Sequence, residues 1–344
     1  MVSLSQQMIA PKSSKRGLLA RALDLTGCGR MIRAAAPWNG VLILNYHRIG
    51  NRHASLLDRN LWSATDEDFD AQIGMIAKSF DVIGLDDLDT VFRAGSGRFV
   101  MITFDDGYRD NYTNAYPILK SYGVPATFFI TTGFLDVPKV PWWDEIAWIV
   151  RSSKLEALDV NPWTVTPVLF DEPHREFAIN RLLSIYKALP GTATEDYISF
   201  LADKLQTGRI PNRIANELWM TWNMIREMKN NGMTFGGHTV NHPIMANLPP
   251  DEQDYEIKEC RRRLVEELGE PLVAFSYPVG GPKSFNGHTR AALVRHGFHW
   301  GFTYQGGYCH YDQEDRLAVP RTAIETDIDL PLFRAITTLP QVFA

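Results

Sequence analysis

Short, almost continuously apolar segments recur along the chain, and they constrain its fold more than any other feature. Strands buried on both faces of a parallel sheet have this pattern, whereas half-exposed strands alternate apolar and polar residues. The sequence therefore predicts a parallel sheet with both faces covered. The segments are rich in β-branched and aromatic residues and lie at 41–46, 99–104, 126–131, 233–237, 273–278, 300–304 and 317–320.

Helical patterns lie between these segments. The range 65–80 begins with a capping-box pattern, and the ranges 111–123 and 249–269 both end at a glycine, which commonly terminates helices. Because strand and helix patterns alternate along most of the chain, we expect an α/β fold. A (β/α) barrel fits the length of the chain.

One stretch interrupts this alternation. Residues 142–225 contain six of the nine tryptophans and helical patterns such as 175–189. We predict a helical, tryptophan-rich insertion between two barrel strands, in a position to form a wall or lid over a site. The predicted division is a basic N-terminal extension at 1–38, a barrel made of 39–141 and 226–335, the insertion at 142–225, and a C-terminal tail at 336–344.

Charge and cysteine content exclude several classes of function. The chain has 35 basic and 40 acidic residues, a net charge of −5, so nucleic acid is not an expected partner. Its three cysteines are widely spaced, which argues against a disulfide framework or a cysteine zinc site. We therefore expect a reducing, cytoplasmic compartment.

The N-terminal residues are basic between Lys12 and Arg33 and lack the pattern of a secretory signal. No apolar run is long enough to span a bilayer. An amphipathic helix in this region has two interpretations: weak contact with an anionic membrane surface, peripheral to the inner membrane, or packing on the domain. Its apolar residues would be Leu18, Leu19, Ala22, Leu23 and Leu25.

Two adjacent carboxylates follow one of the predicted strands. Asp105 and Asp106 lie in the segment TFDDG at the end of the strand 99–104. Two acids are costly to place side by side there unless a cation offsets their charge, and barrel active sites lie at this end of the strands. The alternative is an ordinary Asp-Asp-Gly turn.

Two histidines, His238 and His242, follow another predicted strand in the segment GHTVNHP. Within one helical turn, residues four apart share a face and can converge on one metal ion. The alternative is a pair of surface histidines in a loop. Two imidazoles with one carboxylate would make a metal site with open positions, which leaves the other carboxylate free to act as a general base.

The segments TFDDG, ATFF, GHTVNHP and FSYPVG, in this order, resemble the polysaccharide deacetylases, also called the NodB homology group or carbohydrate esterase family 4. The resemblance runs from about Val41 to Ile324, with the insertion outside its core. It implies a distorted (β/α)7 barrel of the NodB type. It also implies hydrolytic removal of N-acetyl groups from an N-acetylhexosamine-containing oligo- or polysaccharide, such as a chitooligosaccharide or an exopolysaccharide precursor.

The resemblance also implies roles for individual residues. Asp105 would be the general base that activates a metal-bound water, and Asp106, His238 and His242 would bind a divalent metal ion, for which zinc is expected. The backbone at Tyr277 would stabilise the oxyanion.

The chain departs from the family pattern at two places. The segment FSYPVG lacks the arginine that usually orients the base; Arg321 either supplies this charge from another direction or is an ordinary surface arginine. The usual histidine acid is also absent from the last motif. His47, His299 and His310 are candidates for a pocket residue or acid, and His47 is favoured because it ends a predicted strand.

Two other functions remain open from the sequence. The departures suggest a catalytically weak or silent carbohydrate-binding protein of the same fold. Some relatives on this fold act on small amides, so a C–N hydrolase with a small substrate is the other alternative. The exact sugar, its chain length and the oligomeric state are left open.

Overall fold

An eight-stranded, wholly parallel sheet forms the centre of the computed structural model, which describes residues 15–35, 38–171, 174–313 and 315–344. The strand order is β11-β10-β9-β6-β5-β1-β12, and β4 also pairs with β5. The strands are β1 (Gly40–Tyr46), β4 (Asp81–Ile83), β5 (Arg98–Phe104), β6 (Thr127–Ile130), β9 (Thr234–Gly237), β10 (Ala274–Ser276), β11 (Trp300–Phe302) and β12 (Thr322–Ala323).

The sheet curls until its two edges meet through one segment. Val319 forms a parallel bridge with Phe302 of β11, and β12 pairs with β1. This arrangement confirms the predicted distorted (β/α) barrel. The predicted strand 317–320 is wrong in detail, because regular pairing starts only at Thr322. Pro320 has no N–H to donate, so the ladder cannot continue through it.

The barrel interior changes from apolar to polar along the strands. In β1, Val41 and Ile43 belong to one buried apolar cluster. Asn45 lies on the same face of the strand, nearer its carboxyl end, and forms hydrogen bonds with Thr103 and Asp105. Alternate residues of a strand share a face, so the polar side chains gather at the carboxyl ends of the strands. The same change occurs in Met101, Thr103 and Asp105, in Ala274 and Ser276, and in Val319 and Arg321.

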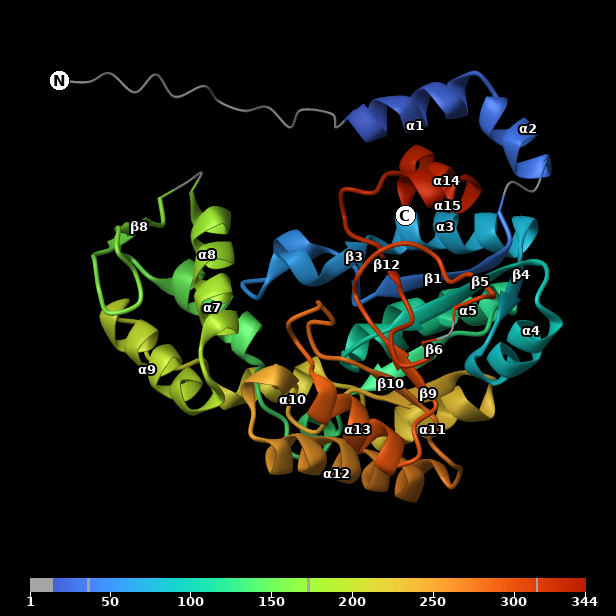
Figure 1. The fold of residues 1–344 in the computed structure, drawn as a ribbon. Helices are drawn as coiled ribbons and strands as arrows, with labels where there is room; N and C mark the ends of the chain where they lie inside the picture. The colour runs from blue at the N-terminus through green and yellow to red at the C-terminus, as the bar shows by residue number, and fades with distance from the viewer. Residues whose placement is uncertain (1–14, 36–37, 172–173, 314) are drawn as a thin grey trace.

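Helices cover the outside of the sheet (Figure 1). Thr65 accepts a hydrogen bond from the Asp68 N–H and caps the first of them, as predicted. Left-handed Gly123 and Gly269 end two others. The predicted helix 111–123 is divided, because residues 111–115 form a π-turn. The helices are α3 (Asp66–Ser79), α4 (Leu88–Ala94), α5 (Tyr116–Tyr122), α6 (Thr132–Asp136), α11 (Trp222–Asn230), α12 (Pro250–Leu268) and α13 (Gly287–Arg295).

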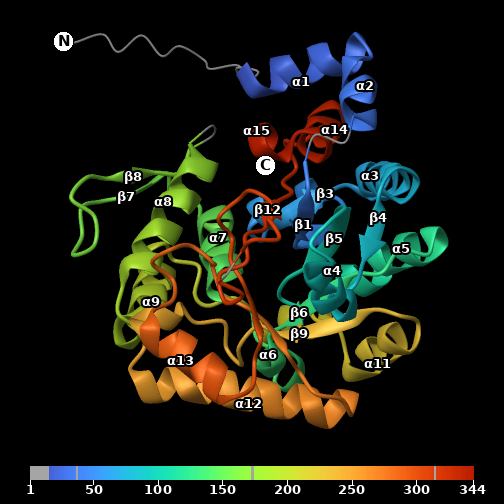
Figure 2. The same cartoon turned by 45° about the vertical axis from the view of Figure 1, so that its right-hand side comes forward.

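The helical insertion lies between β6 and β9, and most of its apolar residues form a second cluster that also includes Leu57, Trp62, Tyr108 and Phe134 of the barrel part. Figures 1 and 2 both show its helices α7, α8 and α9 gathered at one side of the barrel. A short antiparallel hairpin, β7–β8, belongs to the same region. Its elements are α7 (Trp142–Ser152), β7 (Ala157–Leu158), β8 (Val168–Leu169), α8 (Arg175–Ala188), α9 (Thr194–Lys204) and α10 (Ala215–Leu218).

The two ends of the described chain pack together. Helices α1 (Lys15–Leu25) and α2 (Cys28–Ala34) lie over α14 (Leu330–Thr338) and α15 (Pro340–Phe343), as both views show. Ion pairs Arg21–Asp329 and Arg334–Asp24, each 3.0 Å long, join them. Residues 336–344, predicted as a C-terminal tail, lie mostly within α14 and α15.

The N-terminal region is only partly described. Residues 1–14 and 36–37 of the predicted extension 1–38 lie outside the described residues. In α1, Ala20 is buried, whereas Leu18, Leu19 and Leu25 are exposed. None of the described helices has the length and apolar character needed to span a bilayer.

Candidate metal centre and active site

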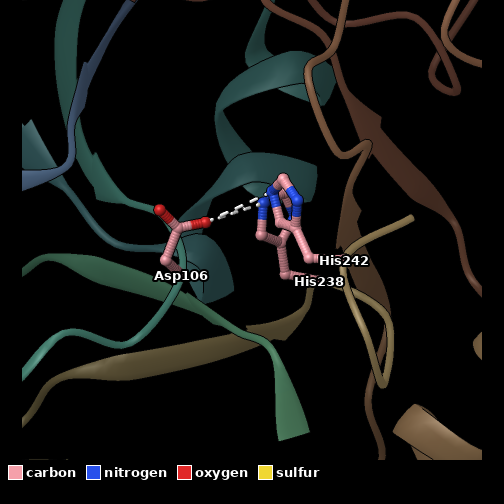
Figure 3. A group of neighbouring side chains, drawn as sticks. All are labelled: Asp106, His238 and His242. Carbon is pink, nitrogen blue, oxygen red and sulfur yellow. Dashed lines mark ion pairs between the residues drawn. The ribbon is translucent and has the colours of Figure 1, made fainter. Parts of the chain in front are cut away.

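Asp106, His238 and His242 converge at the carboxyl end of the sheet. The Nε2 atoms of both histidines lie 3.4 Å from Oδ1 of Asp106, and the three potential ligand atoms all lie within 4.8 Å of one another. Figure 3 shows both imidazoles directed at this carboxylate. All three side chains are buried. The spacing and chemistry of these donors suit one divalent metal ion.

The backbone around the carboxylates explains how two neighbouring residues take different positions. Asp105 continues the extended backbone of β5, and its N–H donates to the carbonyl of Tyr46 in β1. Asp106 has φ 77° and Gly107 has φ 92°, so the chain turns sharply after the strand. A left-handed backbone at an aspartate is uncommon and is held here by the surrounding structure.

The histidines are brought together by a loop, and the predicted helical turn is wrong. Thr239 and His242 have φ values of 68° and 54°, which interrupt any right-handed helix. The loop is held by polar contacts instead. Oγ1 of Thr239 accepts from the His242 N–H, and the carboxylate of Glu256 accepts from the N–H groups of Val240 and Asn241.

Hydrogen bonding leaves the site suited to a metal ion. Nδ1 of His238 lies 2.7 Å from the carbonyl oxygen of Ser276, so it donates there and presents Nε2 to Asp106. Burial lowers the pKa of His242 to about 3, despite the opposing effect of Asp106, so this imidazole is neutral. Oδ1 of Asp106 is buried, and no hydrogen-bond donor to it is found among the described residues, a deficit that a cation would remove.

Asp105 is held by a different partner, Arg321. Nη1 and Nη2 of Arg321 donate to Oδ1 and Oδ2 of Asp105 at 2.8 and 2.7 Å, and Arg321 is 1% exposed. Burial by itself would raise the pKa of Asp105, but the charge and hydrogen bonds of Arg321, together with the nearby histidines, outweigh burial and hold this pKa well below its usual range. The structure therefore brings Arg321 to the carboxylate as an alternative to the missing motif arginine.

The carboxylates and histidines line a cavity of 440 Å³. His47 lies on its wall, where its ring contacts Tyr304 edge to face. His299 and His310 are exposed and do not line this cavity. Of the three histidines considered as an acid, the structure therefore places only His47 beside the carboxylates.

The expected role of the Tyr277 backbone is contradicted by its hydrogen bonding. The Tyr277 N–H donates to the carbonyl of Phe302 at 3.1 Å, because it continues the parallel ladder between β10 and β11. It is therefore not available to a reacting oxyanion. Val279, two residues later, lines the cavity with φ 64°, and no hydrogen bond from its N–H is found within the described chain.

Several contributors to the site were missed in the sequence. Oγ of Ser276 and Nδ2 of Asn45 also donate to Oδ2 of Asp105, at 3.2 and 3.3 Å. The ring of Trp143 packs edge to face on His242, with centroids 4.4 Å apart. The sequence feature that could have indicated Asn45 is its polar side chain inside an otherwise apolar strand. For Trp143 the corresponding feature is its position in the tryptophan-rich insertion.

A buried polar chain connects the insertion to this site. Nε1 of Trp143 donates to the hydroxyl of Tyr108 at 2.8 Å, and that hydroxyl donates to Asp144 at 2.8 Å. Asp144 also accepts from the Asp58 N–H. Burial raises the pKa of Asp144 to about 7, although the charge of Arg48 opposes it. A helix of the insertion thus fixes the aromatic ring that covers one histidine.

Comparison with known proteins agrees with this geometry. A family model described as polysaccharide deacetylase matches residues 92–155 and 191–301, which is just over half of the chain. The match includes both ends of the predicted insertion 142–225. Between the two matched ranges, only residues 156–190 are left out.

Individual relatives are distant or match only part of the chain. YxkH of Bacillus subtilis is 22% identical over 218 residues, 63% of this chain and 49% of that protein. Poly-beta-1,6-N-acetyl-D-glucosamine N-deacetylase of Staphylococcus aureus is 37% identical over 110 residues, 28% of this chain and 37% of that enzyme. The chain thus matches about half or less of the length of these relatives.

A solved structure shares the whole fold. The Streptococcus pyogenes deacetylase PplD, solved with acetate, superposes with a TM-score of 0.57 at 21% identity and covers 90% of this chain and 99% of its own. At this identity the likeness concerns the fold alone.

Replacing His238 tests the metal site. We expect His238→Ala to weaken zinc binding by more than the roughly 10–100-fold typical of losing an outer-shell partner, because it removes a direct ligand. Zinc affinity can be measured by competition with a chelating dye. The control is His299→Ala, an exposed histidine outside the cavity. Unchanged affinity in His238→Ala would refute the assignment.

Asp144 should make stability depend on pH. The unfolded residue ionises near pH 4, whereas the folded residue keeps its proton to about pH 7, so its contribution to stability decreases as pH rises through this window. Asp144→Asn should therefore gain stability relative to the wild type between pH 4 and 7.5, by at most about 4 kcal/mol. Urea unfolding measures this difference. Exposed Asp203→Asn should show no such trend, and equal slopes for Asp144→Asn and wild type would contradict the expectation.

Proposed function

Since the chain belongs to the polysaccharide deacetylase family, we propose that it is a metal-dependent hydrolase that removes N-acetyl groups from an N-acetylhexosamine-containing oligo- or polysaccharide. One observation carries the proposal: an arginine-paired carboxylate lies directly beside a buried Asp-His-His group on the wall of one cavity. In this arrangement one carboxylate can take a proton, and a separate group of three side chains can hold a cation.

A divalent ion, for which we propose zinc, would act as a Lewis acid that polarises the acetyl carbonyl and lowers the pKa of a water molecule. Asp106, His238 and His242 would hold it. The tautomer set by the Ser276 carbonyl and the neutral state of His242 leave imidazole nitrogens free for this purpose.

Asp105 is proposed as the general base. Arg321 keeps its carboxylate ionised, and Oδ1 accepts a hydrogen bond only from Arg321 among the described residues, so acceptor capacity remains. In the reaction, Asp105 takes a proton from water as the water oxygen attacks the acetyl carbon. The bidentate contact fixes the direction in which the carboxylate accepts this proton.

Two further groups complete the chemistry in our proposal. The Val279 N–H lies in a strained loop on the cavity wall and would stabilise the oxyanion in place of Tyr277. His47 would give a proton to the amine nitrogen as the C–N bond breaks, which releases acetate and the free amino sugar.

The name of one relative supports the substrate class that we propose. The matched Staphylococcus aureus enzyme acts, by its name, on poly-beta-1,6-N-acetyl-D-glucosamine. An N-acetylglucosamine polymer or oligomer is therefore the substrate we propose. The alternative of a silent carbohydrate-binding protein rests on the missing motif arginine and the missing histidine acid, and the contact between Arg321 and Asp105 argues against the first of these two reasons.

Asp105→Asn tests the base. The amide keeps a hydrogen-bonding oxygen but cannot take the proton, so acetate release from N-acetylglucosamine oligomers should decrease by about 10²–10⁴-fold. Bound zinc should stay at the wild-type level, because Asp106 and the histidines are unchanged. Both are measured on the same preparation, by an enzyme-coupled acetate assay and by metal analysis. Full activity of Asp105→Asn would show that the base is another group.

Arg321→Ala tests the buried ion pair. Removing the guanidinium leaves Asp105 buried and unpaired, which should cost about 3–5 kcal/mol in the free energy of unfolding. The double variant Asp105→Asn/Arg321→Ala should be less destabilised than the sum of the single variants, because the uncompensated charge is gone. Urea unfolding of the four proteins gives this coupling; additive effects would show that the pair contributes nothing.

A further inference from the structure

Part of the cavity wall comes from the segment that the family model leaves out. Helix α8 lies within residues 156–190, and it contributes Asn180, Leu183 and Lys187 to the cavity. These positions are three and seven residues apart, so they lie on one face of the helix. The cavity thus has a region that the shared catalytic motifs do not account for.

Asp58, from the loop before β3 (Trp62–Ala64), lines the same cavity with unused acceptor capacity. Its side chain is 4% exposed. Oδ1 accepts from both the N–H and the side-chain amide of Asn60, at 3.1 Å each, but no hydrogen bond from the described residues reaches Oδ2. A carboxylate oxygen on a cavity wall that lacks a protein donor can accept a hydrogen bond from a ligand.

Lys187 is a nearby cation that does not neutralise this carboxylate directly. The charges of Asp58 and Lys187 affect each other's pKa, yet no ion pair within 4.0 Å forms between them. The ammonium group lies 5.9 Å from the ring centroid of Trp142. A donor and an acceptor of opposite charge therefore both line the cavity, without contact between them.

Trp142 also carries a hydrogen-bond donor, its indole N–H, for which the described residues supply no acceptor. Its ring stacks on Tyr186 with centroids 4.2 Å apart and an interplanar angle of 10°, which holds it rigidly. Its Nε1 is buried, and no acceptor for it is found among the described residues. Trp142 lines the catalytic cavity and also a neighbouring cavity of 320 Å³, so it lies where a longer substrate would pass from one to the other.

We infer that Asp58, Trp142, Asn180 and Lys187 form a saccharide subsite for the sugar unit next to the one that is deacetylated. The inference rests on the proposed function and specifies how a chain, as opposed to a single sugar, is recognised. Sugar hydroxyls both donate and accept, so they can donate to Oδ2 of Asp58 and accept from the ammonium of Lys187, beside the side chain of Trp142.

The mixed charge of the subsite selects this class of ligand. An anionic substituent would meet the carboxylate of Asp58, and a cationic one would meet the ammonium of Lys187. A neutral, polyhydroxylated unit such as N-acetylhexosamine is compatible with both. Asn180 supports the arrangement, because its Oδ1 accepts from the Asn60 amide that also holds Asp58.

The test measures sugar binding apart from catalysis. Titration calorimetry on the metal-free full chain compares the affinities for an N-acetylglucosamine tetrasaccharide and the monosaccharide. We expect the wild type to bind the tetrasaccharide more tightly. Asp58→Asn, which keeps the oxygen that Asn60 uses, and Lys187→Met should each lose about tenfold in tetrasaccharide affinity.

Lys204→Met is the matched control. Lys204 lies on the neighbouring insertion helix, 5.9 Å from the ring centroid of Phe200, but does not line the cavity. Its tetrasaccharide affinity should equal that of the wild type. Urea unfolding verifies that the variants are folded, and Lys187→Met tests the subsite if Asp58→Asn proves unstable.

Acetate release separates the two proposals. If the variants lose affinity but the metal-loaded wild type releases no acetate from any oligomer, the subsite stands and the proposed function fails. If the wild type releases acetate but both variants bind the tetrasaccharide as the wild type does, the function stands and the subsite is refuted. No preference of the wild type for the tetrasaccharide also refutes it.

Discussion

The buried pair of Asp105 and Arg321 is the interaction on which the site depends. Isolated charges of this kind are expensive inside a protein, so both must be paired and hydrogen-bonded. Arg321 meets this requirement by donating also to Asn45 of β1, Ser276 of β10 and the carbonyl of Thr303. One guanidinium therefore links residues from both sides of the closure between β11 and β12, where the barrel is joined by only a short pairing.

This closure has a consequence for catalysis. The residue proposed as the base sits in the same network that holds the barrel ends together, so its orientation is set by the fold and not by a mobile loop. The neighbouring Asp106 avoids the network because the left-handed turn redirects its backbone. Its Oδ1 has no hydrogen-bond donor in the described part of the chain and faces the two imidazoles. Two adjacent acids thus acquire different chemistry from one backbone conformation.

The insertion contributes to the site as well as covering it. Trp143 packs on His242 and is held through Tyr108 by Asp144, while Trp142 and the α8 face form another part of the cavity wall. The family model matches α7 but omits α8. The contact with the histidine and the position of Trp142 therefore belong to the matched portion of the chain, whereas the proposed sugar contacts from Asp58, Asn180 and Lys187 lie outside it.

Local sequence patterns determined much of this protein. Continuous apolar segments predicted the buried parallel strands, Thr65 and Gly123 marked helix ends, and the positions of Asp105, Asp106, His238 and His242 after strands placed them at one end of the barrel. These features depend on residues adjacent in the sequence or on the direction of a strand, and both can be inferred from the sequence.

Only the tertiary structure decided the rest. It paired Arg321 with Asp105, 216 residues away, engaged the Tyr277 N–H with β11, and joined the histidines through a left-handed loop held by Glu256. It also brought Asp58 and α8 to the same cavity. Hydrogen-bond partners of buried groups are chosen among residues distant in sequence, because burial forces each donor and acceptor to find whichever partner the fold brings within reach.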